Sequence, residues 1–317
     1  MLIHYNVIVM TDTTTLPTFF EPLLAEQYGA ADVERIVAGC GAQRAVTLRA
    51  NTLKAMREDI AVQLDAARIR WQPVSWYDDA FVIEGAREDA IRSLPAYADG
   101  GVYLQSLSSM VPALVLEARA GEDVCDMCAA PGGKTSQIAA LSGGKALIMA
   151  CEMHAPRAEK LEYNLGKLGA SNVTVMRTDA RRLDDFFSFD RILVDAPCSG
   201  SGTLRIGDAN LHKRFTPALV EKSRKAQRAL LGKALGLLKP GGTLVYSTCS
   251  VLACENEDTV RECLNRAPRG ASYEIEPIEL PGIDGMPTLP TSLEGCLALC
   301  PTDLYEGFFV AKIARKQ

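Results

Sequence analysis

Hydrophobic and polar positions follow a regular pattern from Gly121 onward, where short apolar runs alternate with segments of helical spacing. The apolar runs, which are typical of buried strands, are VCDM, ALIMACE, NVTVM, RILVDA and GTLVYST. The helices between them are expected to begin near Lys134, Ala155, Pro217 and Glu255. Strands that alternate with helices predict an α/β fold with a doubly wound, mostly parallel sheet of Rossmann-like type. A last run, EGFFVAKI, predicts a strand in a hairpin at the sheet edge.

The first hundred residues have a different pattern, which predicts a small α+β unit. Helical spacing is found in LPTFFEPLLAEQYG, ADVERIVAGCG and LKAMREDIAVQLDAA. RAVTLRANT alternates as a strand does, and PVSWYDDAFVIEG is typical of a hairpin. Further on, Ser108 is a candidate cap for a helix over Ser109–Leu116. We therefore expect an N-terminal extension (1–15), a small α+β domain (16–100) and a larger domain (101–317).

Composition and charge are those of an ordinary soluble globular protein of 317 residues, with a net charge of −5. This balance gives no overall positive field that would by itself indicate nucleic-acid binding. Basic residues are nevertheless concentrated in one segment, where only Asp208 and Glu221 oppose them: Arg205, Lys213, Arg214, Lys222, Arg224, Lys225 and Arg228. This basic strip is either a phosphate-binding surface or a solvated helix face.

Ten cysteines without a signal peptide indicate a reducing compartment, so we expect a cytoplasmic protein with free thiols. The opening MLIHYNVIVM is too short to span a bilayer. It is either an edge strand or upstream sequence read from an early start. We therefore expect no association with a membrane.

A small-residue turn joins the first strand of the regular pattern to its helix in DVCDMCAAPGGKTSQIAALSGG. In a doubly wound sheet, a nucleotide-like ligand meets backbone N–H groups at this turn, and small residues let it approach closely. Glu152 ends the next strand, where a carboxylate binds ribose hydroxyls, and Asp179 follows the third strand, within reach of an adenine amine. Acids at successive strand ends beside this turn, together with the missing dinucleotide pattern G-x-G-x-x-G, predict S-adenosylmethionine rather than NAD as the ligand.

Cys125 and Cys128 form a C-x-x-C pair, which raises the alternative of a zinc site. Zinc needs two more ligands at matching spacing, and the chain offers only the distant Cys296 and Cys300 and three unpaired histidines. We therefore expect no metal. Cys125 lies within the predicted strand and is expected to be a small buried hydrophobe.

Two further cysteines follow predicted strands, Cys198 in DRILVDAPCSGSG and Cys249 in LVYSTCS. Carbon 5 of a pyrimidine is a poor nucleophile, but a thiolate that adds to C6 turns C5 into an enamine-like centre that can be methylated. One thiol could attack while another residue assists the later release, and Asp195 is placed to face N3 of the base. The alternative is a pair of ordinary buried cysteines.

Four ordered motifs give the chain a family resemblance: DMCAAPGGKT, DAPCSGSGTLR, KPGGTLVYSTCS followed by ENE, and EGFFVAKI. They resemble the NOL/NOP/Sun family of RNA cytosine-C5 methyltransferases, from about Tyr103 to Lys312, and VTLRANTL in the front domain is also similar. The resemblance implies a class I methyltransferase domain preceded by a small RNA-binding-like domain. It further implies an RNA substrate, with ribosomal RNA favoured over transfer RNA, and a monomer.

The resemblance also implies roles for particular residues. Cys249 would be the nucleophile, Cys198 would assist release of the methylated product, and Asp195 would contact the base and the cofactor. Lys134 would also reach the base. The implied S-adenosylmethionine site consists of Cys128, Ala129, Ala130, Pro131, Gly132, Gly133, Lys134, Glu152, Arg157, Asp179 and Asp195.

Three other functions stay open at this point. DNA cytosine methyltransferases attack with the cysteine of a Pro-Cys pair, which here is Cys198, although the STC and PGGKT segments favour the RNA family. An RNA-binding assembly factor could keep this fold without turnover. A small-molecule methyltransferase is disfavoured by the two cysteines and by the basic strip.

Overall fold

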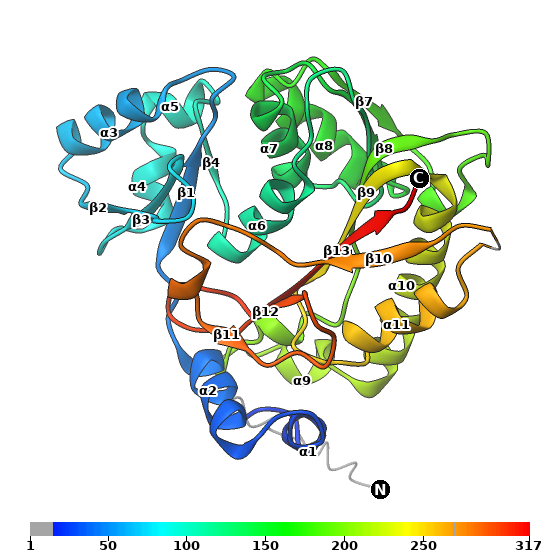
Figure 1. Ribbon diagram of the computed structural model, residues 1–317. Coiled ribbons are helices and arrows are strands. Elements are labelled where there is room, and N and C mark those ends of the chain that lie inside the picture. The colour runs from blue at the N-terminus through cyan, green and yellow to red at the C-terminus, as the bar shows by residue number, and fades with distance from the viewer. Residues whose placement is uncertain (1–14, 269) are drawn as a thin grey trace, which may run out of the picture.

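A large mixed sheet forms the centre of the computed structural model, which describes residues 15–268 and 270–317 (Figure 1). Neighbouring strands in the order β9-β8-β5-β6-β7 are parallel. They are β5 (Asp123–Asp126), β6 (Leu147–Cys151), β7 (Val173–Met176), β8 (Phe189–Asp195) and β9 (Leu238–Thr248). The doubly wound, mostly parallel sheet expected from the sequence is confirmed.

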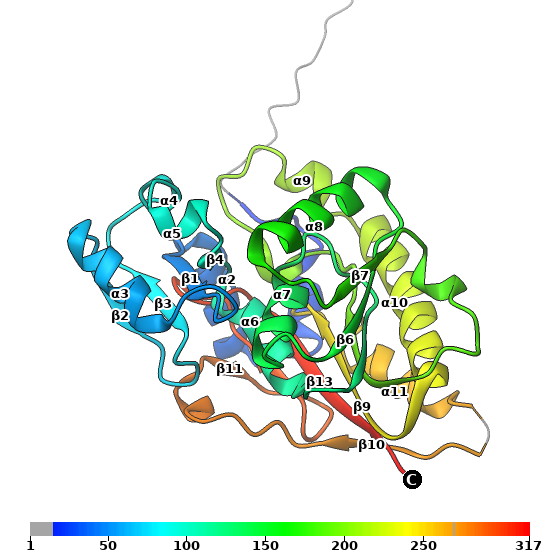
Figure 2. The same ribbon diagram turned by 90° about the horizontal axis from the view of Figure 1, so that it is seen from above.

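Helices cover both faces of this sheet, because successive side chains of a buried strand point to opposite faces (Figure 2). Ile192 and Leu244 belong to the apolar cluster that contains residues of α10 and α11, whereas Leu193 and Val245 pack with α6, α7 and α8. The helices are α6 (Leu107–Leu116), α7 (Gly133–Leu141), α8 (Ala155–Leu168), α10 (Pro217–Leu237) and α11 (Glu257–Asn265). The connections contain α9 (Leu211–Arg214) and the short 3-10 turns η1 (Ala180–Arg182), η2 (Ser201–Thr203) and η3 (Ile283–Gly285).

The strand β13 (Phe308–Arg315) is an interior strand, so the prediction that EGFFVAKI forms an edge hairpin was wrong. It pairs antiparallel with β9 on one side. On its other side β12 (Leu297–Leu299) pairs with its first half and β10 (Tyr273–Glu276) with its second half. β11 (Thr288–Leu289) then pairs with β12. These covering strands are too short to give a clear alternation in the sequence.

A second, antiparallel sheet has the order β2-β3-β1-β4 and lies beside α6 and α7 (Figures 1 and 2). Its strands are β1 (Val46–Ala50), β2 (Trp71–Pro73), β3 (Ala80–Ile83) and β4 (Val102–Leu104). The helices α3 (Arg57–Ala66), α4 (Glu88–Arg92) and α5 (Pro95–Ala98) accompany it. Leu48, Ile60 and Phe81 are fully buried in its core. The expected hairpin is confirmed as the pair β2–β3.

Three local details differ from the sequence prediction. The small sheet extends past residue 100, because β4 pairs with β1. The helices α1 (Phe20–Ala25) and α2 (Ala30–Gly41) pack in the core of the larger domain, where Phe20 and Ile36 are fully buried. The helix α6 begins at Leu107 after Ser106, so Ser108 is not its cap. Instead the Ser108 hydroxyl donates to the carbonyl of Glu306 at 2.8 Å.

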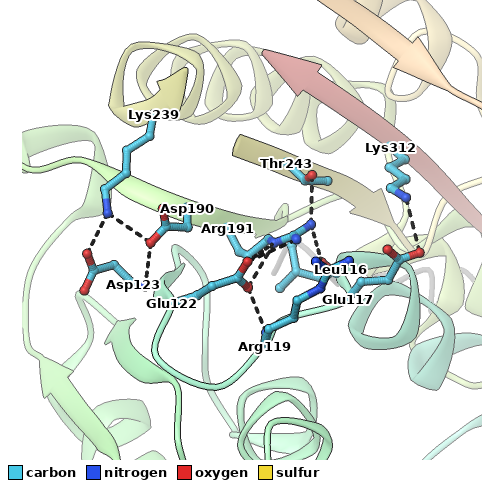
Figure 3. A network of polar contacts seen from close by, with 10 residues as sticks. All are labelled: Leu116, Glu117, Arg119, Glu122, Asp123, Asp190, Arg191, Lys239, Thr243 and Lys312. Atoms are coloured by element: carbon cyan, nitrogen blue, oxygen red, sulfur yellow. Dashed lines mark hydrogen bonds and ion pairs between the residues drawn. The ribbon is translucent and has the colours of Figure 1, made fainter. Parts of the chain in front are cut away.

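Charged side chains connect the amino ends of the central strands (Figure 3). Lys239 Nζ lies 2.7 Å from Asp123 Oδ2 and 2.9 Å from Asp190 Oδ2. Arg191 Nε lies 3.1 Å from Glu122 Oε2. These ion pairs join β5, β8 and β9 at the end of the sheet opposite to the one that carries the predicted site.

The opening segment MLIHYNVIVM lies outside the described residues, so its assignment stays a prediction. Within the part of the chain that the structure describes, no helix has both the length and the apolar character needed to span a membrane.

Candidate functional site

The carboxyl ends of the parallel strands bring the predicted site residues to one edge of the sheet, as expected for a doubly wound fold. A cavity of about 960 Å³ opens there between the ends of β5, β6 and β8 and the first turns of α10. Its lining includes eight of the predicted site residues: Cys128, Ala130, Glu152, Arg157, Asp179, Asp195 and the two thiols, Cys198 and Cys249.

Glu152 is buried at the end of β6, where its carboxylate is held by two neighbours. Oε1 accepts the backbone N–H of His154 at 2.8 Å, and Oε2 lies 3.1 Å from Arg157 Nη1. Arg157 also donates to the carbonyl of Ala130 at 2.9 Å. Arg157 therefore connects the acid after β6 to the small-residue turn after β5.

Asp179 is paired with Arg181, a residue that the sequence did not single out. Arg181 Nε lies 2.9 Å from Asp179 Oδ1, and its Nη2 lies 2.6 Å from Oδ2. These hydrogen bonds hold the pKa of Asp179 below its ordinary value. The carboxylate at this position is therefore ionised and already oriented by the protein.

The glycines of the turn have a packing role that the sequence did not reveal. A Cβ on Gly133 would lie 2.9 Å from the Tyr103 ring, and a Cβ on Gly132 would lie 3.0 Å from Leu161 Cδ1. Gly132 also has a φ of 107°, in the left-handed region that favours glycine. Among the described residues, the linings of this cavity and of the one described next contain every predicted cofactor residue except Gly132.

A second cavity of about 320 Å³ lies on the other side of Asp195 and Cys249, which line both spaces. Its wall also contains Lys134, Phe308 and Asp126. Ala129, Pro131 and Gly133 of the turn line this second cavity as well. The structure thus separates the predicted site into two adjoining spaces with Asp195 and Cys249 between them.

Lys134 and Asp195 form an ion pair between the two cavities. Lys134 Nζ lies 2.8 Å from Asp195 Oδ2 and donates to Ser109 Oγ at 2.8 Å, while Ser247 Oγ donates to Asp195 Oδ1 at 2.8 Å. Burial lowers the pKa of Lys134, but the charge of Asp195 and the hydrogen bond to it outweigh burial, so this pKa lies above its ordinary value. The ammonium group is therefore charged and fixed in direction.

Asp126 is a buried carboxylate at the end of β5 that the sequence analysis missed. It accepts hydrogen bonds from Thr135 Oγ1 at 2.7 Å and from the backbone N–H of Cys128 at 3.2 Å. Burial raises its pKa to about 6, although the bond from Thr135 opposes the shift. Its position at a strand end, directly before the turn, was the available signal.

The two thiols meet because β8 and β9 are parallel neighbours that end at the same level. Cys198 Sγ lies 3.0 Å from Cys249 Sγ, and both residues are half-buried. The pKa of Cys198 is raised well above its ordinary value by the hydrogen bond with Cys249, by burial and by the charge of Glu255. Cys198 is therefore predominantly protonated at neutral pH and can donate its S–H to Cys249.

Comparison with known proteins identifies the family. The model of the 16S rRNA methyltransferase family RsmB/F matches residues 113–314, and that of the RsmF/B-like ferredoxin-like domain matches residues 16–88. The chain belongs to the RsmB/F family. Among its relatives, ribosomal RNA small subunit methyltransferase F of Cronobacter sakazakii is 36% identical over 95% of this chain and 63% of its own length. The methyltransferase F of Serratia proteamaculans is also 36% identical, over 94% of this chain and 63% of its own length. The chain thus spans about three-fifths of the length of these relatives.

Solved structures share the fold of this RsmB/F family member. A methyltransferase homologue from Pyrococcus horikoshii has 31% sequence identity and a TM-score of 0.76, covering 95% of this chain and all (100%) of its own. NSun6 from the same organism, solved with SFG, has 23% identity and a TM-score of 0.84, covering 96% of this chain and 99% of its own. These similarities support the class I methyltransferase domain with a smaller ferredoxin-like domain before it.

The basic strip of this RsmB/F chain is partly neutralised by its own acids. Arg224 Nη1 lies 3.1 Å from Glu221 Oε2, and Lys225 Nζ lies 3.6 Å from Glu221 Oε1. Arg228 pairs with Glu262 at 2.9 Å. Lys222 and Lys225 are exposed and line the larger cavity, so the strip faces the predicted site but carries less free charge than the sequence suggested.

The pair Cys125 and Cys128 does not lie in a metal-binding cluster. Within residues 15–268 and 270–317, no group of three or more His, Cys, Asp or Glu side chains is placed to hold a metal ion. Cys125 is fully buried, as predicted.

Proposed function

We propose that this chain transfers a methyl group from S-adenosylmethionine to C5 of a cytosine in ribosomal RNA. The observation that carries the proposal is the pair of thiols 3.0 Å apart, one of which, Cys249, lies between two adjoining cavities. Membership of the RsmB/F family supports ribosomal RNA as the substrate class.

The larger cavity fits the proposed cofactor in size and in chemistry. Its volume of about 960 Å³ lies in the range of small-molecule sites, and it places two carboxylates, Glu152 and Asp179, along one wall. Glu152 would accept from the ribose hydroxyls and Asp179 from the adenine amine. S-adenosylmethionine would supply an electrophilic methyl group. Arg157 would keep Glu152 oriented through the contact described above.

The smaller cavity would receive the cytosine, which must leave its stack to enter it. Cys249 Sγ would add to C6, which forms the S–C6 bond and makes C5 nucleophilic. Asp195 would face N3, and Lys134 would hold Asp195 in place while reaching the same base. After C5 has been methylated, the C5 proton leaves and the S–C6 bond breaks, which restores the Cys249 thiolate. In this last step Cys198 would take the C5 proton in its thiolate form, which its raised pKa makes the minor form at neutral pH.

The proposal is tested by separating the two thiols. We expect Cys249→Ala to abolish both methylation and any covalent adduct with RNA, because the nucleophile is lost. We expect Cys198→Ala to stop turnover but to leave protein trapped on RNA, because addition precedes methyl transfer and release follows it. Denaturing electrophoresis measures the adduct, which should require S-adenosylmethionine and an unmodified cytosine.

The same experiment distinguishes the alternatives. Trapping by Cys249→Ala but not by Cys198→Ala would reverse the roles, as in the DNA-type mechanism. Methylation of transfer RNA but not of ribosomal RNA by the wild-type chain would change the substrate class. If wild type and all variants bind RNA but neither methylate it nor form an adduct, the chain is an RNA-binding assembly factor without turnover.

A further inference from the structure

Glu255 is a fully buried carboxylate that lies between the two loops carrying the thiols. Its Oε1 accepts the backbone N–H of Ser199 at 2.8 Å, and its Oε2 accepts the Ser199 hydroxyl at 2.5 Å. Oε2 also accepts the Ser250 hydroxyl at 2.6 Å. Ser199 directly follows Cys198, and Ser250 directly follows Cys249. One carboxylate therefore bonds to the neighbour of each thiol.

Both oxygens of the Glu255 carboxylate accept hydrogen bonds from neighbouring residues. Gln227 Nε2 of α10 donates to Oε1 at 3.2 Å, and the hydroxyls of Ser201 and Ser250 lie 2.8 Å apart, so that the two loops also touch directly. A buried charge is stable only when it is compensated by such hydrogen bonds. Burying the Glu255 carboxylate therefore costs desolvation free energy, which a neutral, apolar contact between the two loops would not.

The sheet alone does not fix the distance between the thiols. Pairing between β8 and β9 ends at Asp195 and Ser247, and each cysteine lies beyond that point. The position of each thiol consequently depends on the contacts of its own loop. Among the described residues, Glu255 bonds to both loops at the residue next to the thiol.

We propose that Glu255 is a positioning residue that holds Cys198 against Cys249 and places a negative charge beside the loop that carries Cys198. The part that concerns release rests on the function proposed above. The part that concerns the geometry of the two thiols does not, and the two parts are tested separately.

The geometry is tested by the rate at which hydrogen peroxide joins the thiols. In this reaction the two thiols give up two protons and two electrons, an S–S bond forms, and the O–O bond of peroxide breaks to give two waters. We expect Ser250→Ala to slow the formation of the Cys198–Cys249 disulfide about tenfold, since it removes a charge-assisted bond while keeping the charge of Glu255. In a Glu255→Gln background the same serine change should have no further effect. Mass spectrometry measures the disulfide.

Ser142→Ala is the matched control, because Ser142 is another buried serine and its hydroxyl donates to the Ala139 carbonyl at 3.1 Å, within the end of α7. It should leave the rate of disulfide formation unchanged. Cys125 and Cys151 are fully buried, so their protection from alkylation shows that each variant remains folded.

The role in release is tested by the pH dependence of methylation turnover in proteins that keep Cys198. Turnover should speed up as pH rises, because Cys198 acts in its thiolate form. Glu255→Gln removes a negative charge that helps to raise the pKa of Cys198, so the pH at which turnover reaches half of its maximum should move down, by about one unit. A purely structural defect would change turnover at every pH alike. Glu257→Gln, a buried glutamate two positions further on, should keep the wild-type profile.

Two results would overturn the proposal: wild-type disulfide rates in folded Ser250→Ala and Ser199→Ala, or a wild-type pH profile in folded Glu255→Gln. Failure of Cys198→Ala to trap any RNA would instead refute the proposed function. The disulfide measurement would still decide whether Glu255 holds the thiols together.

Discussion

At the scale of single residues, Asp126 carries a free-energy cost that the fold does not need. Its pKa is raised from 3.8 to about 6, chiefly by burial. The stability linked to this group is therefore fully present below pH 3.8 and is lost as pH rises through about 6. A shift of this size corresponds to ~3 kcal/mol at neutral pH. A carboxylate kept at such a cost beside Lys134 and Cys128 indicates a role in the site rather than in folding.

We therefore expect Asp126→Asn to be more stable than wild type at pH 7.5, by up to ~3 kcal/mol, and nearly equal to it at pH 4. The amide can still accept from the Cys128 N–H, so the turn should keep its shape. Urea unfolding at the two pH values measures the difference. The exposed Asp89→Asn should show no such pH-dependent gain. Equal stability of Asp126→Asn and wild type at pH 7.5 would contradict the raised pKa.

At the scale of elements, α10 presents the exposed lysines of the basic strip beside the larger cavity. Lys222 and Lys225 are exposed there, although Lys225 lies 3.6 Å from Glu221, whereas Arg224 and Arg228 are less exposed and paired with acids. We expect Lys222→Glu with Lys225→Glu to weaken RNA binding and to reduce the slope of log affinity against log salt by ~0.9 for each lost phosphate contact. Binding titrations at several salt concentrations measure the slope.

The control for α10 is Lys145→Glu, an exposed lysine that precedes β6 at the opposite end of the sheet. It makes the same kind of charge change away from the site and should leave the slope unchanged. If the α10 variants also keep the wild-type slope, the strip is a solvated helix face.

The parallel elements could be predicted from the sequence because each has a strong local signal. RILVDA and GTLVYST are continuous apolar runs, as expected of strands that are covered on both faces, and Thr216 and Pro217 mark the start of α10. The neighbours of β13 could not be predicted, because strand pairing depends on distant segments. Asp126, Arg181 and Glu255 were missed for a related reason: their importance comes from burial and from partners far away in the chain.

At the scale of the whole molecule, two buried side chains join the domains: Arg49 in β1 and Asn51 directly after it. Arg49 is fully buried and donates from Nη2 to the Gly133 carbonyl at 3.0 Å and to Ser136 Oγ at 2.7 Å, both in α7. Asn51 Nδ2 donates to the Leu168 carbonyl at the end of α8 at 2.7 Å. The segment VTLRANTL thereby connects the small sheet to the two helices that follow the small-residue turn and the Glu152 strand.

This connection predicts an effect at a distance. Arg49→Lys keeps the charge, but its single nitrogen cannot take the place of both Nε, which contacts Gln105, and Nη2, so we expect a loss of ~2 kcal/mol in stability and about tenfold weaker binding of S-adenosylmethionine. Thermal unfolding and calorimetry measure the two quantities. Arg57→Lys is the control, since Arg57 stacks on Trp71 within the small domain. Unchanged cofactor affinity in a folded, destabilised Arg49→Lys would show that the link serves stability alone.

The interior position of β13 has a consequence for the order in which the protein is made. β13 leaves the ribosome after β9, β10 and β12, yet it lies between β9 on one side and β10 and β12 on the other. Until it emerges, β9 is an open edge and the strands β10 to β12 have no sheet to join. The helices and parallel strands can form during translation, but the nascent chain cannot complete the wall to which Phe308 belongs. This cavity wall is therefore completed only after synthesis of the core, when β13 inserts between strands made earlier.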